Sequence, residues 1–340
     1  METSVLGRSD LPSISVVVPT INNRGTLGTL LDSLMELDYD RDRIEVVIVD
    51  GDKSGKIEKI VSAYPFTIVK DEGMGLNRAR NIGLKKSNHE IVAFTDDDCV
   101  VSKDWALRIA ESFLDPSVGF VGGRVVGYSK KEILSTYVDE TIVPTMPRFK
   151  EKVVTRKLLR SHLPAGCNMA FRRKALEKID YLDERISYGF DDIESVERIA
   201  DMGFNIVLNP EVLIFHKHRV RLWEFLKQNF RYGRGGMLYL LARTRSHIHE
   251  ALSKYLIGVY SGLMILSLPL LAAFITGNPL FLAVTFGLSI APWLSLMGFY
   301  ARRFKDGKSL KRIFLYPLLD ILRGLSFAFG ALYQLLSRRR

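Results

Sequence analysis

Apolar and polar positions along the first 220 residues follow two different periods. Short apolar runs rich in β-branched residues predict strands, and segments with apolar residues at helical spacing predict helices. The expected strands cover residues 14–18, 44–49, 66–70, 90–95 and 206–215, and the expected helices cover residues 26–37, 57–63, 76–86 and 193–202. Strands and helices alternate over the first 95 residues, which implies right-handed crossovers. We therefore expect an α/β fold with a mixed, mainly parallel sheet and helices on both faces.

The chain between residues 255 and 301 has a different pattern, because no charged residue occurs in it. As a helix this run would be about 70 Å long at 1.5 Å per residue. That length is enough for two crossings of a hydrocarbon core about 30 Å thick. Gly277, Asn278 and Pro279 supply a turn near its middle. We expect membrane spans at 255–276 and 280–300, and not a buried soluble hairpin, because neither segment has a polar face.

A third apolar segment, residues 313–336, contains Asp320 and Arg323 on one helical face. The basic loop 302–312 before it is expected to be cytoplasmic, and this places the residues before Tyr255 in the cytoplasm as well. A third crossing would put the arginines 338–340 outside, against the charge rule. The segment is thus either a span or a re-entrant or interfacial helix, and we favour a span because very short tails constrain topology weakly. The predicted division is 1–220 for the α/β domain, 221–254 for interfacial amphipathic helices and 255–340 for a transmembrane domain.

The distribution of charge argues against a nucleic-acid partner. The formal net charge is +10, but ten basic and two acidic residues between 301 and 340 carry +8 of it. The first 300 residues are therefore nearly neutral, and the excess lies beside apolar segments, as expected for a membrane-flanking bias. Cys99 and Cys167 are too few and too far apart in the sequence for a disulfide framework or a cysteine zinc site, which favours a reducing compartment. Residues 1–13 lack the apolar core of a secretory signal peptide.

Three of the predicted strands end in chemically distinctive residues. The first ends in Pro19 and Thr20, the second in Asp50 and Gly51, and the fourth in Asp96, Asp97 and Asp98. Ligands of open α/β sheets bind beyond the carboxyl ends of the strands. Adjacent carboxylates repel one another unless a cation or hydrogen-bond donors offset them, and hard divalent ions prefer oxygen ligands. A divalent metal at 96–98 is favoured over a solvated acidic turn. The first turn is not glycine-rich, which excludes a dinucleotide-binding fold.

Four further motifs have both a structural and a functional interpretation. Residues 73–81 place glycines and arginines at a helix start, which suits phosphate but is also typical of a surface helix. Asp191 and Asp192 open a helix, either as first-turn acids or as a general base. His216 and His218 are either structural or additional metal ligands. Residues 228–235 form either an amphipathic interfacial helix or a sugar and phosphate contact.

The ordered set of motifs resembles the family 2 inverting glycosyltransferases with the GT-A, nucleotide-diphospho-sugar transferase fold. The resemblance covers roughly residues 12–240. The matching pieces are Val18-Pro19-Thr20, Val49-Asp50, Ala79-Arg80-Asn81, Asp96-Asp97-Asp98, Gly166-Cys167-Asn168, Asp191-Asp192 and Gln228-x-x-Arg231-Tyr232. The last piece is similar to the Q-x-x-R-W element of cellulose-synthase-like enzymes, with Tyr232 in place of Trp. The likeness is to a minimal membrane-bound member, as in archaeal and bacterial enzymes that build lipid-linked or cell-surface glycans.

The resemblance implies a role for each matching residue. It implies that the nucleotide donor is bound by Pro19, Thr20, Asn23, Asp50, Arg80, Asp96 and Asp97. A divalent metal, Mn²⁺ or Mg²⁺, would be held by Asp98 with Asp96, and His216 and His218 are candidates for additional ligands. Gly166, Asn168, Gln228, Arg231 and Tyr232 would contact the donor sugar, the acceptor or the diphosphate. Asp192 would be the catalytic base, with Asp191 the alternative.

The implied reaction is transfer of a sugar from a nucleotide donor to a polyprenyl- or dolichol-phosphate-linked or other membrane-associated glycan at the cytoplasmic face. GDP-mannose is the favoured donor, and a UDP-sugar is the alternative. We expect an integral protein of the cell membrane whose partners are the nucleotide sugar, the lipid-linked acceptor and membrane lipids. The nearest rival is a processive polysaccharide synthase, for which two or three spans look too few to form a channel. A membrane-anchored nucleotide- or nucleic-acid-binding protein is the non-enzymatic rival, and the sequence does not indicate an oligomeric state.

Overall fold

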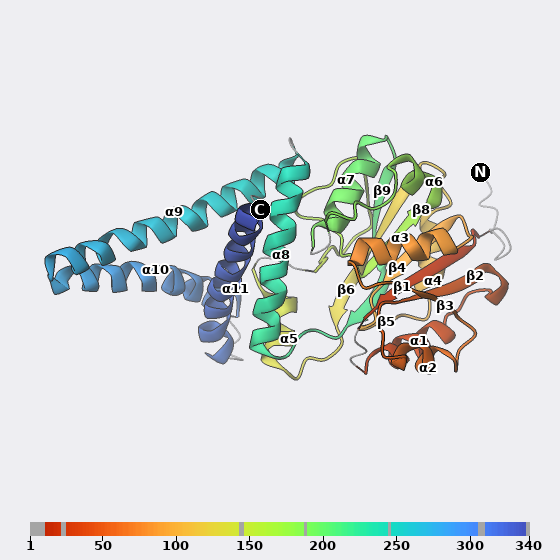
Figure 1. Cartoon of the computed structure of the whole chain (residues 1–340), viewed down its shortest axis with the longest axis horizontal. Coiled ribbons are helices and arrows are strands. Elements are labelled where there is room, and N and C mark those ends of the chain that lie inside the picture. The colour runs from red at the N-terminus through yellow and green to blue at the C-terminus, as the bar shows by residue number, and fades with distance from the viewer. Residues whose placement is uncertain are drawn as a thin grey trace. The chain divides into compact units, whose positions relative to one another are not determined.

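A computed structural model describes residues 11–21, 25–142, 146–186, 189–243, 246–304 and 310–337 (Figure 1). The chain forms two compact units, residues 1–139 with 144–218, and residues 140–143 with 219–340. The strands are β1 Ile14–Thr20, β2 Ile44–Asp50, β3 Thr67–Lys70, β4 Ile91–Thr95, β5 Cys99–Val101, β6 Val118–Gly127, β7 Val153–Thr155, β8 Asn168–Arg172 and β9 Asn205–His216. The helices of the first unit are α1 Leu27–Met35, α2 Lys56–Val61, α3 Leu76–Lys86, α4 Trp105–Ser112, α5 Ile133–Glu140, α6 Arg173–Lys178 and α7 Asp191–Asp201, with a short 3₁₀ turn at Arg41–Arg43.

The strands of the described residues form one mixed sheet in the order β3-β2-β1-β4-β8-β6-β9-β5, with β7 paired to β9. The first half, β3-β2-β1-β4, is parallel, as the alternation of strands and helices predicts. The second half is mixed, because β8 runs antiparallel to both β4 and β6. Helices cover both faces: Val16 and Val18 pack in the core with the leucines of α1, while Val17 points to α3 on the other face.

The strand β1 is two residues longer than the strand predicted at 14–18, which Pro19 was expected to end. The strand continues to Thr20, because its pairing with β4 ends at Val17 and only β2 flanks the last residues. A proline that lacks an N–H group is tolerated where one side of the strand makes no ladder hydrogen bonds. The extra residue brings the Thr20 side chain to the edge of the sheet beside Asp50, its register partner in β2.

Glycine sets the distance between α3 and the sheet. A Cβ added at Gly83 would lie 2.3 Å from a methyl group of Val17 and 2.9 Å from one of Val49. Only a residue without a side chain allows the helix to approach so closely, since packed cores leave no space for an added methyl group. This close packing fixes α3, which carries Arg80 in its second turn.

The second unit consists of long helices, α8 Leu222–Ala242, α9 His247–Thr276, α10 Pro279–Arg303 and α11 Leu310–Ser337. The turn predicted at 277–279 separates α9 from α10: Gly277 has a φ of 67°, and the Asn278 side chain accepts a hydrogen bond from the Leu280 N–H. Among the described residues, α9, α10 and α11 are each long and apolar enough to cross a membrane. The third apolar segment forms one continuous helix, α11. That this helix spans a membrane stays a prediction.

A pair of glycines allows α8 and α11 to pack closely. A Cβ at Gly233 would lie 1.9 Å from the Phe327 carbonyl oxygen, and one at Gly330 would lie 1.9 Å from the Phe230 carbonyl oxygen. In Figure 1 the two helices lie side by side. Small residues at such crossings let helix backbones approach, as is common in membrane helix pairs.

Substituting either glycine with alanine should destabilise this helix pair. Overpacking a well-packed contact typically costs about 1–3 kcal/mol, and here the obstacle is backbone that cannot rotate away. We expect Gly233→Ala and Gly330→Ala to lower the thermal unfolding midpoint of the detergent-solubilised protein. Gly258→Ala in α9 is the matched control, because its Cβ would meet nothing within 4 Å. Equal midpoints for Gly330→Ala and Gly258→Ala would contradict the proposed contact.

Candidate active site

The carboxyl ends of β1, β2 and β4 meet at one edge of the sheet, and their polar residues contact one another there. The Thr20 hydroxyl donates a hydrogen bond to Asp97 at 2.6 Å, which joins the ends of β1 and β4. The turn after β4 is closed by the Cys99 N–H, which donates to the Asp96 carbonyl oxygen at 3.1 Å. The three consecutive aspartates are thus held in a compact turn, with Asp96 and Asp97 partly exposed and Asp98 buried.

Asp50 is fully buried at the end of β2, and both of its carboxylate oxygens are engaged. One accepts a hydrogen bond from the Asp52 N–H at 2.8 Å, and the other lies 2.6 Å from the Lys70 ammonium group. Lys70 is the register partner of Asp50 in the neighbouring strand β3. The carboxylate raises the pKa of Lys70, mainly through this hydrogen bond. Sequence reasoning missed Lys70, although it ends the third predicted strand, where parallel register places it beside Asp50.

Arg80 connects the aspartate turn to the start of α7. Its side chain is 1% exposed, and its guanidinium donates to Asp191, to the Gly166 carbonyl oxygen at 2.9 Å and to Asp96 at 3.5 Å. Burial alone would lower the pKa of Arg80, but the charges of Asp191 and Asp96 raise it overall. The sequence predicted that Arg80 approaches the nucleotide-sugar donor. In the structure its N–H groups instead bind Asp191, Gly166 and Asp96 of the protein. A Cβ at Gly166 would lie 3.0 Å from this guanidinium, which explains a glycine there.

Asp191 and Asp192 are adjacent in sequence but have different surroundings. Asp191 is buried and neutralised by Arg80, while Asp192 is half-buried and accepts a hydrogen bond from the Ile193 N–H at 2.8 Å. Phe190 precedes them with a φ of 65° and ends the loop where α7 begins. Burial and the neighbouring Asp191 charge raise the pKa of Asp192 to about 7. A carboxylate with a pKa near neutral pH has the property required of a general base.

A chain of hydrogen bonds runs from Asp98 through both histidines. His216 Nε2 lies 3.2 Å from Asp98 Oδ1, His216 Nδ1 lies 2.8 Å from His218 Nδ1, and His218 Nε2 lies 3.2 Å from Asp139 Oδ1. Burial would lower the pKa of His216, but Asp98 raises it to about 9, while burial lowers the pKa of His218. Asp98 therefore favours the charged form of His216, whereas burial favours the neutral form of His218. Asp139 in α5 ends this chain of hydrogen bonds, and nothing in the sequence indicated its part in it.

The donor groups at Asp98 and His216 suit a divalent ion. Two ligand atoms at right angles around an ion, each about 2.1 Å from it, lie about 3 Å apart, close to the 3.2 Å between Asp98 Oδ1 and His216 Nε2. Carboxylate ligands suit both Mn²⁺ and Mg²⁺, and the imidazole favours Mn²⁺ over Mg²⁺, which prefers oxygen ligands. Asp96 adjoins them, and burial raises the pKa of its carboxyl. His218 is turned to Asp139 and is joined to Asp98 only through His216.

Asn168 lies in the interior and not on a pocket surface. Its side chain is fully buried, its amide oxygen accepts from Trp105 Nε1 at 2.9 Å, and its amide nitrogen donates to the Arg124 and Val212 carbonyl oxygens. These bonds leave no group on Asn168 to contact a sugar, which differs from the expectation for this residue. A single buried amide instead joins β8, β6, β9 and α4, and this arrangement depends on contacts between distant segments.

The other predicted site residues are placed as follows. Pro19 is buried near the end of β1, and Asn23 lies outside the described residues. Gln228, Arg231 and Tyr232 lie in α8 of the second unit, where the Gln228 amide donates to the Tyr232 hydroxyl at 3.0 Å and Arg231 is exposed.

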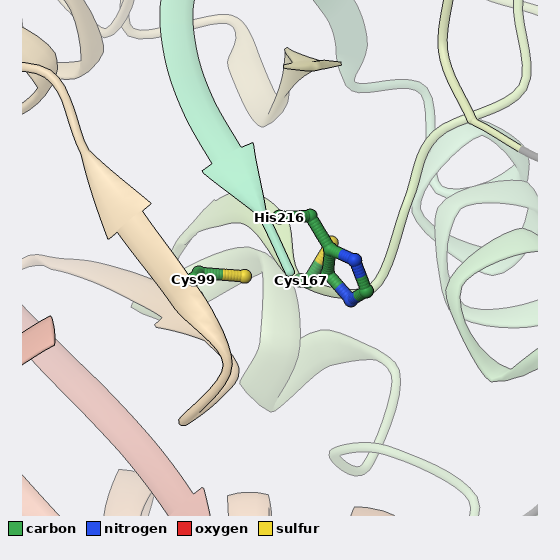
Figure 2. Close-up of side chains that lie close together, drawn as sticks. All are labelled: Cys99, Cys167 and His216. Atoms are coloured by element: carbon green, nitrogen blue, oxygen red, sulfur yellow. The ribbon is translucent and has the colours of Figure 1, made fainter. Parts of the chain in front are cut away.

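The structure brings the two cysteines close together, although they are far apart in the sequence. Cys99 and Cys167 are distant in the sequence, but the antiparallel pairing of β5 with β9 and the loop before β8 bring both close to His216 (Figure 2). Their sulfur atoms and a ring nitrogen of His216 all lie within 4.8 Å of one another. The sequence contained one indication that the cysteines lie near the site, because Cys99 follows Asp98 and Cys167 follows Gly166. Their closeness to each other could be inferred only once the order of the strands in the sheet was known.

The chain is similar to known glycosyltransferases. Residues 15–180 match the family Glycosyl transferase family 2. Glycosyltransferase AglE of Haloferax volcanii is 25% identical over 234 residues, which are 67% of this chain and 74% of AglE. The probable glycosyltransferase YdaM of Bacillus subtilis is 25% identical over 250 residues, which are 68% of this chain and 57% of YdaM. The mannosyltransferase PcManGT from Pyrobaculum calidifontis, solved with GDP-Man and Mn²⁺, has a TM-score of 0.64 at 20% identity, covering 96% of this chain and 88% of that chain.

The structural similarity confirms the predicted GT-A fold. The family match spans β1 to β8 and includes the aspartate turn and Arg80. The chain therefore carries a glycosyl transferase family 2 domain over residues 15–180, and the relatives that match it are glycosyltransferases.

Proposed function

We propose that the protein is a metal-dependent, inverting mannosyltransferase that uses GDP-mannose and a lipid-linked or membrane-associated glycan acceptor at the cytoplasmic face of the cell membrane. The observation that carries the proposal is the bridge made by Arg80. It contacts both Asp96 of the aspartate turn and Asp191, the neighbour of the half-buried Asp192. A carboxylate suited to proton removal therefore stands beside a carboxylate and histidine group suited to a nucleotide diphosphate and its metal.

The reaction follows from these positions. Asp192 accepts the proton of an acceptor hydroxyl, whose oxygen attacks the anomeric carbon of the donor sugar. The bond from that carbon to the diphosphate oxygen breaks, and the nucleoside diphosphate leaves from the opposite face. One displacement of this kind inverts the anomeric configuration. Asp191 is held by the Arg80 guanidinium, and its proximity raises the pKa of Asp192.

The remaining donor contacts are assigned by resemblance and by placement. Thr20 and Asp97 hold the ends of β1 and β4 together, and Pro19, Asn23 and Asp50 belong to the predicted nucleoside side of the site. Asp98 with Asp96 and His216 would hold Mn²⁺ or Mg²⁺, which when bound neutralises charge on the leaving diphosphate. Because the side chains of Arg80 and Asn168 are buried and bind other protein groups, we propose that they position the residues around the site and do not contact the substrate. Arg231, Gln228 and Tyr232 are proposed to contact the diphosphate or acceptor.

The donor and the acceptor have separate support. PcManGT, which shares the fold, was solved with GDP-Man and Mn²⁺, and this favours GDP-mannose over a UDP-sugar. The three apolar helices of the second unit favour an acceptor in a membrane. Arg302 and Arg303 at the end of α10 belong to the predicted basic loop, and the positive-inside rule favours the cytoplasm for that loop.

A panel of nucleotide sugars with Mn²⁺, Mg²⁺ or chelator tests the proposal. Release of nucleoside diphosphate and transfer to a membrane lipid extract are measured for each donor. We expect GDP-mannose with Mn²⁺ to give the fastest transfer, one sugar added per acceptor and no transfer in chelator. A ladder of long products would indicate a processive polysaccharide synthase instead. Absence of transfer and of donor hydrolysis with every donor would contradict the proposal.

The pKa of Asp192 predicts how the reaction depends on pH. The base acts only when deprotonated, and burial together with Asp191 raises its pKa to about 7. We therefore expect kcat/KM to be low in mild acid and to rise through about pH 7 to a plateau. Initial rates at saturating metal measure the profile. A profile without a rising limb in this range would contradict the assignment of Asp192 as the base.

A further inference from the structure

Two buried thiols that have no part in the proposed transfer meet the His216 imidazole beside the aspartate turn. Cys99 begins β5, Cys167 lies in the loop before β8, and His216 ends β9. Figure 2 shows that the Cys99 sulfur points toward the others and that Cys167 lies against the His216 ring. Both cysteines are free thiols, and the three ligand atoms all lie within 4.8 Å of one another. Three separate segments of chain thus converge on one small volume.

This set of donors differs in kind from the carboxylates of Asp96 and Asp98. Thiolate and imidazole are the ligands that Zn²⁺ and other thiophilic ions select, whereas Mn²⁺ and Mg²⁺ favour oxygen. Packing alone would be served by aliphatic side chains, but here two thiols face a polar ring. The chemistry of the three groups therefore favours a soft metal ion over a hard one.

The spacing is compatible with a tetrahedral ion after a small contraction. Sulfur ligands about 2.3 Å from Zn²⁺ lie about 3.8 Å apart in a tetrahedron, compared with separations of up to 4.8 Å in the cluster. Side-chain movements that bring the ligand atoms about 1 Å closer together would give the tetrahedral spacing. Both ring nitrogens of His216 already have partners, Asp98 and His218, so ligation of a metal replaces one of these contacts.

We propose that Cys99, Cys167 and His216 form a binding site for a thiophilic metal ion of the Zn²⁺ class, and that this site shares His216 with the carboxylate site at Asp98. Binding releases the two thiol protons and the proton on the ligating nitrogen of His216. The remaining coordination position is filled by Asp98 or by water. Because one imidazole serves both sites, Zn²⁺ at the cysteines should disturb the Mn²⁺ or Mg²⁺ at Asp98; this consequence rests on the proposed function, whereas Zn²⁺ binding does not.

Cobalt substitution tests the site directly in the wild-type, full-length protein. Co²⁺ bound to thiolates gives an intense ligand-to-metal charge-transfer absorption in the near ultraviolet, which carboxylate and imidazole ligands do not give. We expect this band to appear with one Co²⁺ per chain under reducing conditions and to vanish when Zn²⁺ is added. Absence of the band at saturating Co²⁺ would overturn the proposal, and the measurement needs neither donor nor acceptor.

Variants locate the ion. Cys99→Ser and Cys167→Ser should each weaken the band, and the double variant should abolish it and lower the affinity for Zn²⁺ by at least about 10²-fold, judged by competition with a coloured chelator. His89→Gln is the matched control, since this histidine lies outside the cluster, and it should leave the band unchanged. Unchanged Zn²⁺ affinity in a double variant that retains its wild-type melting midpoint would refute the site.

Activity gives an independent reading of the shared histidine. Submillimolar Zn²⁺ should inhibit wild-type transfer in the presence of Mn²⁺, and the inhibition constant should rise by at least about tenfold in the double variant. Cobalt binding without this difference in inhibition would overturn the shared role of His216 while leaving the site itself. Failure of transfer in the absence of Zn²⁺ would instead count against the proposed function.

Discussion

Replacing Asp192 with asparagine should lower kcat by about 10²–10⁴-fold, the usual contribution of a general base. Asparagine preserves the shape of the side chain and its acceptor for the Ile193 N–H, but it cannot take up a proton. The KM for the nucleotide sugar should change little, because Asp192 acts on the acceptor hydroxyl. The rising limb of the pH profile should disappear together with the activity.

Asp201→Asn is the control for this substitution, since it makes the same chemical change at the far end of α7. It should keep near wild-type rates. Initial-rate kinetics with the preferred donor and acceptor measure both variants. If Asp192→Asn retained a kcat within a few-fold of wild type, the base would have to be assigned elsewhere, with Asp191 as the alternative.

Removing the guanidinium of Arg80 should destabilise the first unit by about 3–5 kcal/mol, the cost of leaving a buried charge without its partner. Arg80 is 1% exposed and its partner Asp191 is nearly as buried. Arg80→Met keeps much of the side-chain volume while removing every hydrogen bond to Asp191, Asp96 and Gly166. For a domain of about 200 residues the melting midpoint should fall by about 2–4 °C for each kcal/mol. Transfer activity should fall too, because Asp191 and Asp96 lose the group that positions them.

A double substitution separates the ion pair from packing. Adding Asp191→Asn to Arg80→Met removes the uncompensated charge and should recover part of the lost stability. Arg78→Met, on the same helix but 38% exposed, is the control; Arg78 pairs with the exposed Glu72 at 3.1 Å and lies 3.9 Å from the buried Asp71 carboxylate. Exposed pairs contribute about 0–1 kcal/mol and the Asp71 contact is long, so its midpoint should fall much less than that of Arg80→Met. If Arg80→Met and Arg78→Met melted together, Arg80 would not be the link between the two carboxylate groups.

Local periodicity predicted most of the elements in the first half of the sheet and their order. The strands at 44–49 and 90–95 and the helix at 76–86 are present within a residue or two, because buried strands and amphipathic helices have patterns visible in one segment. The positions of the strands β5, β6, β7 and β8 were not predicted. Their pairing depends on segments far apart in the chain, and Pro19 shows that even a local stop signal depends on which neighbours flank the strand.

The residues of the candidate site also fall into those that the sequence predicted and those that only the structure revealed. The aspartates 96–98 and the pair Asp191 and Asp192 were found from the sequence, because strand ends and helix starts of a parallel sheet gather at one edge. The uses of Arg80 and Asn168 were not predictable, since each is decided by partners that lie 16 to 111 residues away in the sequence. The same holds for Lys70 and Asp139, which lie beside their partners only once strands and helices are packed.

By itself, the sequence determined which groups could carry chemistry, where the apolar helices lie and which strands carry the aspartates. These features follow from side-chain type and period, which are local properties. Only the tertiary structure decided which groups surround Asp192 and raise its pKa. It also decided that the buried Arg80 contacts both Asp96 and Asp191, and that Cys99, Cys167 and His216 lie close together. Burial, charge proximity and ligand spacing are properties of groups brought together by folding, so no segment read alone contains them.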